Sequence, residues 1–413
     1  MRSWWARGAC CAALAAAGTA LAAAGTALAA AGTALAAAGT ALAAAGAAAA
    51  DPPALTWVKA TRSPQPAAAL APEVAALTAR CGAADAALAA VARRNVERQL
   101  QGGEIMPPDE LAFTLRAAGA PHAWPRGWSI AGQGLGPAEL GARIDGWLSG
   151  WPTLGVRRCG VAHAKKPDGT VIAAAVGVDA LADMSPLPTT ARVGQWVTLE
   201  GTMRVPATAV KVVLLGPRGA PRAVLSSLSG ARIRSSFAVD QPGSWLVQVL
   251  ATVSTGPRPV LEAMIFAGGA PPGRYVRAPS PGEEAARGAR DDDDAMLRMM
   301  NAARASEGLP ALARDAALSA LARAHAEAML KARMVGHDVG SGDPAARLRA
   351  AGYEATIAGE NVATSSSPGG AHRAIWASPS HRGNLLDRRY RKTGVAVVRD
   401  RSGRVWVAQL FAG

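Results

Sequence analysis

The chain has 413 residues, of which half are hydrophobic and only 18% are charged. This length suggests two or three domains, and this composition excludes a wholly disordered chain. The formal net charge of +14 raises the question of nucleic-acid binding, although arginines spread over the surface would account for it equally well. The four cysteines are too few for a fold built on disulfides at this length.

Residues 1–50 have the composition of an export signal. Arg2 and Arg7 precede a long apolar run that contains no acidic residue and ends in small residues. Within this run the heptapeptide Leu-Ala-Ala-Ala-Gly-Thr-Ala starts at Leu14 and then repeats in tandem. The recurring Gly and Thr disfavour a permanent membrane span or a coiled coil. We therefore expect a signal peptide that is cleaved, with a retained membrane anchor as the alternative.

Export would change the partners that a basic protein meets. The expected location is secreted, periplasmic or in the cell envelope, where anionic lipid and polysaccharide are abundant and genomic DNA is not. No clustered basic stripe lies beside stacking aromatic residues in the sequence. The sequence predicts envelope lipid or polysaccharide as partner, no nucleic acid, and no stable transmembrane span after cleavage; it leaves the oligomeric state open.

The next part of the chain predicts a linker and then a mixed α/β domain. Residues 51–72 are rich in Pro and Ala, which is typical of a linker. Residues 73–180 combine helical patterning with a buried strand near their end. Cys81 and Cys159 both lie in this domain and are the only cysteines left after signal removal. Because an exported compartment permits oxidation, we predict a disulfide between them.

Residues 188–268 differ from what precedes them. Short alternating apolar runs, each bounded by turn residues, predict a small β-sandwich. No polar cluster in this module looks catalytic, so its expected role is that of a spacer or an adhesion module. Residues 269–294 are dense in Pro, Gly and charge and predict a second linker, whose final run Asp291–Asp294 would complement the dipole of the helix that follows.

The remaining residues, 295–413, predict an ordered succession of helices and strands. Apolar spacing indicates helices at about 296–304, 315–333 and 343–351, the last ending at Gly352. Two strands near the end, joined by a glycine-bearing turn, predict an antiparallel hairpin. In the second helix His325 is expected to pack in the core, whereas the later His372 is expected at the surface.

Three motifs in this part identify a family resemblance. In chain order they are Gly359-Glu360-Asn361, then Trp376-x-Ser378-Pro379-x-His381-Arg382-x-Asn384-Leu385, then Thr393-Gly394-Val395-Ala396. Residues 294–413 thereby resemble the CAP superfamily (cysteine-rich secretory proteins, insect antigen 5 and plant pathogenesis-related proteins), in particular its short bacterial members. The resemblance implies a secreted α-β-α sandwich, and the fold class of the whole chain is then α+β.

The same resemblance implies a polar cleft. Carried over by motif, it is lined by His337, Glu360 and His381, with Asn361, Arg382 and Asn384 in support. In the family the two histidines can bind zinc or another divalent metal, and two imidazoles with a carboxylate are suitable zinc ligands. The family's second glutamate corresponds to Pro379 here, so the ligand set is incomplete. No other cofactor is expected.

Three functions remain open at this stage. The first is a ligand-binding protein whose cleft holds a lipid, a glycan or another envelope component. The second is a metal-assisted hydrolase or protease using His337, Glu360 and His381. The third is a structural or adhesion protein that acts through its β-sandwich. Because no serine or cysteine nucleophile is tied to a histidine by motif, the balance is against an enzyme.

A sequence echo suggests that residues 73–180 are a degenerate second copy of the last domain. Leu-Arg-Ala-Ala-Gly occurs at both 115–119 and 348–352. Leu88 and Leu321 lie at the same distance before the final glycines of these two segments. The hypothesis predicts the same helix order and the same closing hairpin in both domains.

This second copy would lack the cleft chemistry. If the two domains are matched at the spacing that separates the two Leu-Arg-Ala-Ala-Gly segments, Glu104 takes the position of His337 and Gly127 takes that of Glu360. The copy would then keep the fold while losing both a histidine and the acid.

Overall fold

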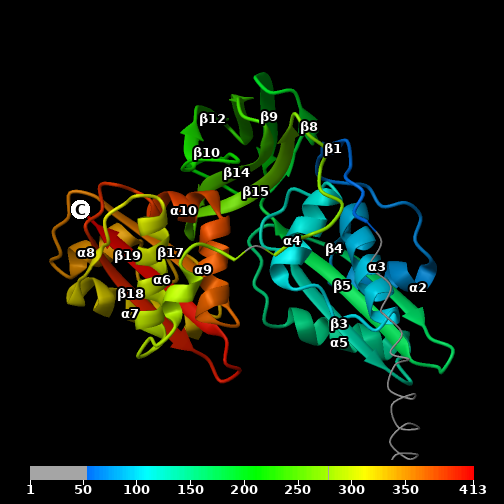
Figure 1. Ribbon diagram of the computed structural model, residues 1–413. Helices are drawn as coiled ribbons and strands as arrows, with labels where there is room; N and C mark the ends of the chain where they lie inside the picture. The colour runs from blue at the N-terminus through cyan, green and yellow to red at the C-terminus, as the bar shows by residue number, and fades with distance from the viewer. Residues whose placement is uncertain (1–53, 278) are drawn as a thin grey trace, which may run out of the picture. The chain divides into compact units, whose positions relative to one another are not determined.

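The computed structural model describes residues 54–277 and 279–413 (Figure 1). The expected export signal lies outside these described residues. Within them, every helix is too short or too polar to cross a membrane. Three modules follow one another along the chain, which we call the N-terminal domain (72–180), the two-sheet module (182–267) and the C-terminal domain (292–412). The chain is thus a mixed α+β protein.

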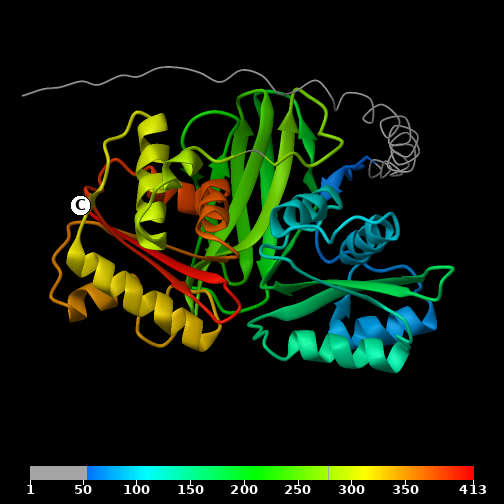
Figure 2. The ribbon, with the colours of Figure 1, turned by 60° about the horizontal axis from the view of Figure 1, so that its bottom comes forward.

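The N-terminal domain is a four-stranded sheet with helices on both faces. Its sheet order is β2-β4-β5-β3, in which β2 pairs in parallel with β4 and the other pairs are antiparallel. Figure 2 shows α3 and α4 on one side of this sheet and α2 and α5 on the other. Its elements are α2 (Pro72–Cys81), β2 (Ala83–Ala84), α3 (Ala86–Leu100), α4 (Pro108–Ala117), β3 (Arg126–Gly132), α5 (Pro137–Leu148), β4 (Val156–Lys165) and β5 (Val171–Ala180).

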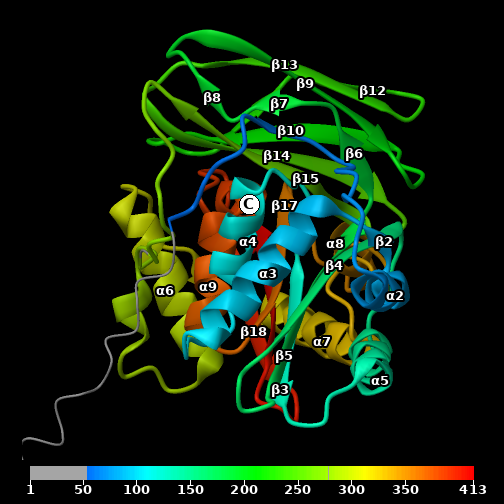
Figure 3. The same cartoon turned by 90° about the vertical axis from the view of Figure 1, so that its right-hand side faces the viewer.

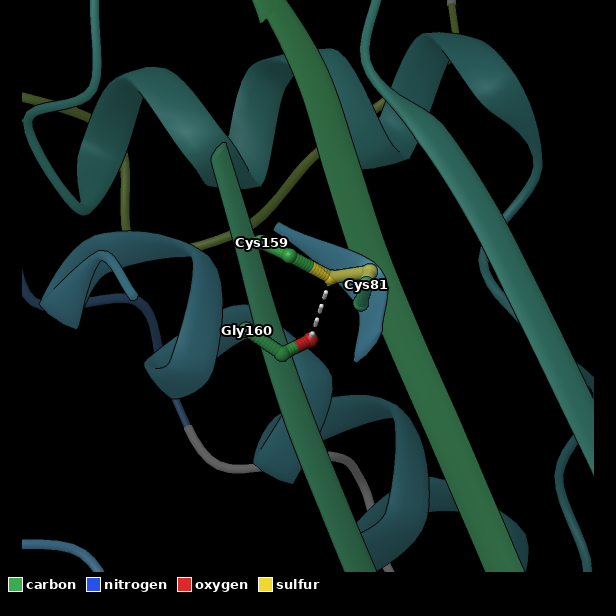
Figure 4. The surroundings of a disulfide bond; sticks show 3 residues. All are labelled: Cys81, Cys159 and Gly160. Carbon is green, nitrogen blue, oxygen red and sulfur yellow. Dashed lines mark hydrogen bonds between the residues drawn. A yellow bond between two sulfur atoms is a disulfide. The ribbon is translucent and has the colours of Figure 1, made fainter. Parts of the chain in front are cut away.

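A disulfide ties the end of α2 to the middle of β4. It joins Cys81 to Cys159, whose Cα atoms are 5.7 Å apart, and both residues are fully buried (Figure 4). The bond closes a loop with a sequence separation of 78. It therefore links the first helix of the domain to β4, a strand near the C-terminal end of the same domain.

The two-sheet module has one hydrophobic core between its sheets. The first sheet has the order β11-β10-β14-β15-β8 and the second β12-β13-β9-β6, and apolar residues from both form a single cluster that includes Trp245. Its elements are β6 (Ala182–Met184), β7 (Leu187–Pro188), β8 (Thr190–Ala191), β9 (Gln195–Met203), β10 (Ala209–Leu215), β11 (Arg222–Val224), β12 (Ser226–Ser229), β13 (Arg232–Val239), β14 (Gly243–Val253) and β15 (Gly256–Ala267).

The segment that was expected to be a linker before the N-terminal domain is held in place. Its strand β1 (Ala60–Thr61) pairs with β7, and the Ser63 N–H donates to the carbonyl of Met184. Residues 54–71 therefore pack against the two-sheet module instead of spacing the domains apart.

The C-terminal domain again places a four-stranded sheet between two layers of helices (Figure 2). Helices α7 and α8 pack on one face, and α6 and α9 pack on the other. The sheet order is β16-β18-β19-β17. Its elements are α6 (Asp292–Ser306), β16 (Ala313–Arg314), α7 (Ala316–Ala332), α8 (Pro344–Ala350), β17 (Ala358–Ser365), α9 (Pro368–Ala377), α10 (Pro379–Leu385), β18 (Lys392–Arg399) and β19 (Val405–Ala412).

The acidic run before this domain belongs to helix α6. Asp291 caps the helix by accepting the N–H of Asp294, so the helix begins at Asp292 and not near Ala295 as expected. Asp293 reaches further: one oxygen accepts the N–H of Val397 and the other pairs with Arg323 at 2.6 Å. The run therefore joins α6 to the sheet and to α7, in addition to complementing the helix dipole.

The N-terminal and C-terminal domains share their pairing pattern. In each, the first short strand pairs in parallel with the third, and the last strand lies between the third and the second. The helix order also agrees, except that α10 is added in the C-terminal domain. Gly160 and Gly394 occupy equivalent places, since a Cβ on either would collide with the backbone of the helix that follows the first strand.

Candidate functional site

The candidate site is built around the buried carboxylate of Glu360 on β17. Its side chain is fully shielded from solvent, and both of its oxygens are engaged. Oε1 lies 2.8 Å from Nδ1 of His337, and Oε2 accepts a hydrogen bond of 2.7 Å from Nη2 of Arg347. The predicted pair of His337 and Glu360 is thus in direct contact, and an arginine completes the network.

Arg347 was missed in the sequence and is central to the geometry. It lies on α8, and only 7% of its side chain is exposed. Besides Glu360, its guanidinium donates to the carbonyls of His337 (3.1 Å) and Gly342 (3.2 Å). It therefore fixes both the acid and the loop that carries the histidine. The only available sequence signal was its position beside Leu348, on the helix face that must turn inward.

His325 supports the same loop from α7. Its Nε2 lies 2.9 Å from the carbonyl oxygen of Gly336 and 3.7 Å from Oε1 of Glu360. The residue is buried in the core, as expected from the helical spacing. Burial lowers the pKa of His325, and the negative charge of Glu360 opposes this effect.

His381 lies on α10, and two asparagines fix that helix to β17. The side-chain amide of Asn361 donates to the carbonyl of His381 at 3.1 Å. The amide of Asn384 donates to the carbonyl of Glu360 and to Oδ1 of Asn361, both at 3.0 Å. Both asparagines therefore contact the protein's own backbone and each other.

The ring of His381 is close to His337 but is not joined to it. In the described part of the chain, no hydrogen bond links this ring to His337 or Glu360. Burial lowers the pKa of His381 to about 4, with the charge of His337 acting in the same direction and that of Glu262 against it. Arg382, the third supporting residue, turns away, because its guanidinium stacks 3.9 Å from the ring centroid of Trp376.

These residues do not fit a zinc ion. Zinc sites in proteins need at least three protein ligands with free lone pairs. Here Arg347 and His337 occupy the two oxygens of Glu360, and the position of the family's second acid is Pro379. Across residues 54–277 and 279–413, no three His, Cys, Asp or Glu side chains are arranged to hold a metal ion.

The expectation that His372 lies at the surface is wrong. The residue is fully buried, and its Nε2 lies 2.8 Å from the carbonyl oxygen of Pro281. The reason is that the segment before α6 folds over α9, where Glu283 also pairs with Arg373 at 2.6 Å. The predicted second linker therefore forms part of the C-terminal domain's packing.

Two histidines with lowered pKa values, the buried His122 and the partly buried His381, predict how stability depends on pH. Burial lowers the pKa of both His122 and His381 to about 4, so each stays neutral in the folded chain at pH values where the unfolded chain binds a proton. The free energy of unfolding should therefore be highest above pH 7 and should fall between about pH 6.5 and pH 4, by at most about 3 kcal/mol per histidine. Urea unfolding across this range measures the effect.

A substitution isolates one of these contributions. Among the described residues neither ring nitrogen of His122 has a hydrogen-bond partner, so His122→Leu should preserve stability at neutral pH and should flatten part of the acid dependence. His163→Leu, which removes a half-buried histidine on β4, is the matched control. Equal pH slopes for the wild type and His122→Leu would contradict the prediction.

The family of the C-terminal domain follows from its match to a family model. Residues 297–411 match the cysteine-rich secretory protein family, CAP. This match covers the loop that carries His337, strand β17 with Glu360 and helix α10 with His381. The segment is a CAP-superfamily domain, as its motifs indicated.

Three of the solved structures with some similarity come from Borrelia burgdorferi, Bacillus anthracis and Staphylococcus aureus. An outer surface protein of Borrelia burgdorferi has 20% identity and a TM-score of 0.29, over 30% of this chain and 92% of that one. An extracellular protein of Bacillus anthracis with an SCP domain has 16% identity and a TM-score of 0.28, over 56% and 86%. A cysteine-rich secretory protein of Staphylococcus aureus has 10% identity and a TM-score of 0.25, over 56% and 85%. No curated protein sequence matches the chain.

Proposed function

We propose that this protein is exported and acts in the cell envelope or outside the cell, where its CAP domain binds a lipid, a glycan or another envelope component at His337, Glu360 and His381. One observation carries the proposal. A charged network is buried at Glu360, although a buried charge pair is at best neutral for stability. Of its members, His337 is partly exposed, with 16% of its side chain accessible. The network therefore has an outward-facing member that a ligand can meet.

The N-terminal domain supports this reading, because we infer that it is a divergent copy without the network. Gly127 pairs with Val176 in the same place in the sheet as Glu360 pairs with Leu410. A Cβ at Gly127 would lie 3.2 Å from a methyl carbon of Leu111. The N-terminal domain thus forms the same topology with apolar packing at this position, whereas the C-terminal domain holds a charge there. The topology does not require the charge, which argues that the charge serves binding.

The hydrolase alternative finds less support in the geometry. Both oxygens of Glu360 are hydrogen-bonded inside the fold, so the partly exposed His337 is the candidate general base of this network. The hydroxyl of Ser378 accepts from Gln248 and lies 3.3 Å from the hydroxyl of Ser380, so it contacts no histidine. Binding therefore fits the arrangement better than catalysis does.

Adhesion through the two-sheet module stays a second candidate because two large apolar side chains are exposed there. Trp196 on β9 is 71% exposed and Leu225, between β11 and β12, is 92% exposed. Side chains of this kind occur at binding surfaces. They provide the comparison variant for a binding test.

His337→Ala should weaken binding at least about tenfold, because the ligand loses the exposed end of the network. We would measure sedimentation of the full chain with phosphatidylglycerol vesicles and with insoluble peptidoglycan, at about 150 mM salt to screen the general attraction of a basic surface. His163→Ala is the matched control, since it removes a partly exposed histidine elsewhere.

The other outcomes separate the alternatives. Binding that survives His337→Ala but is lost in Trp196→Ala would transfer the function to the two-sheet module. Stoichiometric zinc in the purified protein, lost together with a hydrolytic activity in His337→Ala and His381→Ala, would establish the metal-assisted hydrolase and overturn the binding proposal.

A further inference from the structure

The turn between β14 and β15 of the two-sheet module lies against the loop of His337. The carbonyl of Thr255 accepts the N–H of Asp338 at 3.3 Å. At Gly256, a Cβ would lie only 3.1 Å from the Cβ of His337, and φ is +90°, so both space and backbone conformation favour glycine there. The turn of the hairpin therefore packs directly against His337 and leaves little room for a side chain at position 256.

The same hairpin also holds the helix of His381. Gln248 on β14 is fully buried, and its Oε1 accepts the N–H of Ser380 at 3.0 Å. Its Nε2 donates to the hydroxyl of Ser378 at 3.3 Å. Ser378 makes no side-chain cap for α10, although the first N–H groups of a helix need acceptors. Gln248, which belongs to the two-sheet module, therefore caps the helix that carries His381.

Glu262 stands behind Gln248 on the neighbouring strand. Its Oε1 accepts a hydrogen bond of 2.7 Å from Nε2 of Gln248, and its other oxygen pairs with Arg116 of α4. The carboxylate is near enough to His381 to raise the pKa of that histidine against the effect of burial. An acid from outside the CAP domain thus acts on the histidine, whereas position 379 within the domain is a proline.

We propose that the histidine site is shared by two modules, with the β14–β15 hairpin as its second wall; Figure 3 shows β14 and β15 side by side in the two-sheet module. Gln248 and Glu262 are positioning residues for the helix of His381. The Thr255–Gly256 turn lies against one side of His337 and so restricts the approach of a ligand to this partly exposed ring. This inference deepens the proposed function by naming the part of the chain that controls access to the same site.

Chemical labelling of the histidines in the full chain tests the proposal without any ligand. Diethyl pyrocarbonate modifies exposed imidazoles, and mass spectrometry gives the labelling rate of each histidine. In Gln248→Ala the rates at His337 and His381 should rise at least about fivefold, while the rate at His163, the internal reference, should not change. Unchanged rates at both site histidines in a folded Gln248→Ala would overturn the proposal.

A cross-link provides the opposite change and does not depend on a destabilising variant. Thr255→Cys with Asp338→Cys places two thiols where the backbones already touch. Oxidation of this pair should slow labelling of His337 at least about fivefold relative to the two single cysteine variants. An unchanged rate in the cross-linked protein means that the turn does not restrict access to the ring. Failure of this test leaves the His337→Ala binding result untouched, so the two proposals fail separately.

Discussion

Arg347→Ala should lower the free energy of unfolding of the C-terminal domain by about 3–5 kcal/mol, the cost of leaving a buried charge without its partner. The variant removes the guanidinium from Oε2 of Glu360 and from two loop carbonyls. The contact with His337 then remains for the carboxylate, with Nε2 of His325 at 3.7 Å. Urea unfolding followed by amide exchange in β17 reports on this domain specifically.

Two further variants show whether the charge is responsible. Arg349 lies on the same helix but is exposed, so Arg349→Ala should change stability by less than about 0.5 kcal/mol. Adding Glu360→Gln to Arg347→Ala removes the unpaired charge and should recover part of the loss. If the double variant is as unstable as the sum of the single variants, the effect comes from packing and the electrostatic account is wrong.

Loss of the disulfide should destabilise the N-terminal domain by about 4.5 kcal/mol, from the entropy of a closed loop of this length. The variant Cys81→Ala with Cys159→Ala should lose about as much stability as the reduced wild type, because both changes remove the same cross-link from a buried position. Urea unfolding followed by amide exchange in β4 and β5 measures the loss.

The exchange of β18 and β19 serves as the internal control for this experiment, because these strands belong to the C-terminal domain. Their protection should not change when the disulfide is removed. Two free thiols in the protein isolated from its natural host, detected by mass spectrometry, would refute the disulfide.

Local patterns predicted the elements well where they depend on nearby residues. The helix expected at 315–333 is α7 at Ala316–Ala332, and Asp315 caps it by accepting the N–H of Leu318. The closing hairpin also agrees to within a residue. Caps, apolar spacing and turn glycines act over a few positions, so they are legible in a single sequence.

Contacts between distant parts of the chain could not be predicted in the same way. Nothing near Glu360 in the sequence indicates Arg347, because their meeting depends on how α8 packs over β17. The sequence echo paired Leu88 with Leu321, whereas in the helices Leu88 has the same place as Leu318: each donates its N–H to the capping aspartate. Loops of unequal length in the two domains shift such sequence matches. The equivalent residues can then be found only from the strand pairing in the structure.

The strand order of the two domains has a consequence for how the chain is made. Strand β19, which is buried along its whole length, lies between β18 and β17. The short β16 cannot pair until β18 has been synthesised. A growing chain therefore cannot complete this sheet until residue 412 has emerged. Likewise, the sheet of the N-terminal domain cannot be completed before β5 has been synthesised, and Cys81 cannot form its disulfide before Cys159 has been synthesised. Each domain stays unfinished during most of its own synthesis, the state in which a polypeptide can still be threaded through a narrow channel.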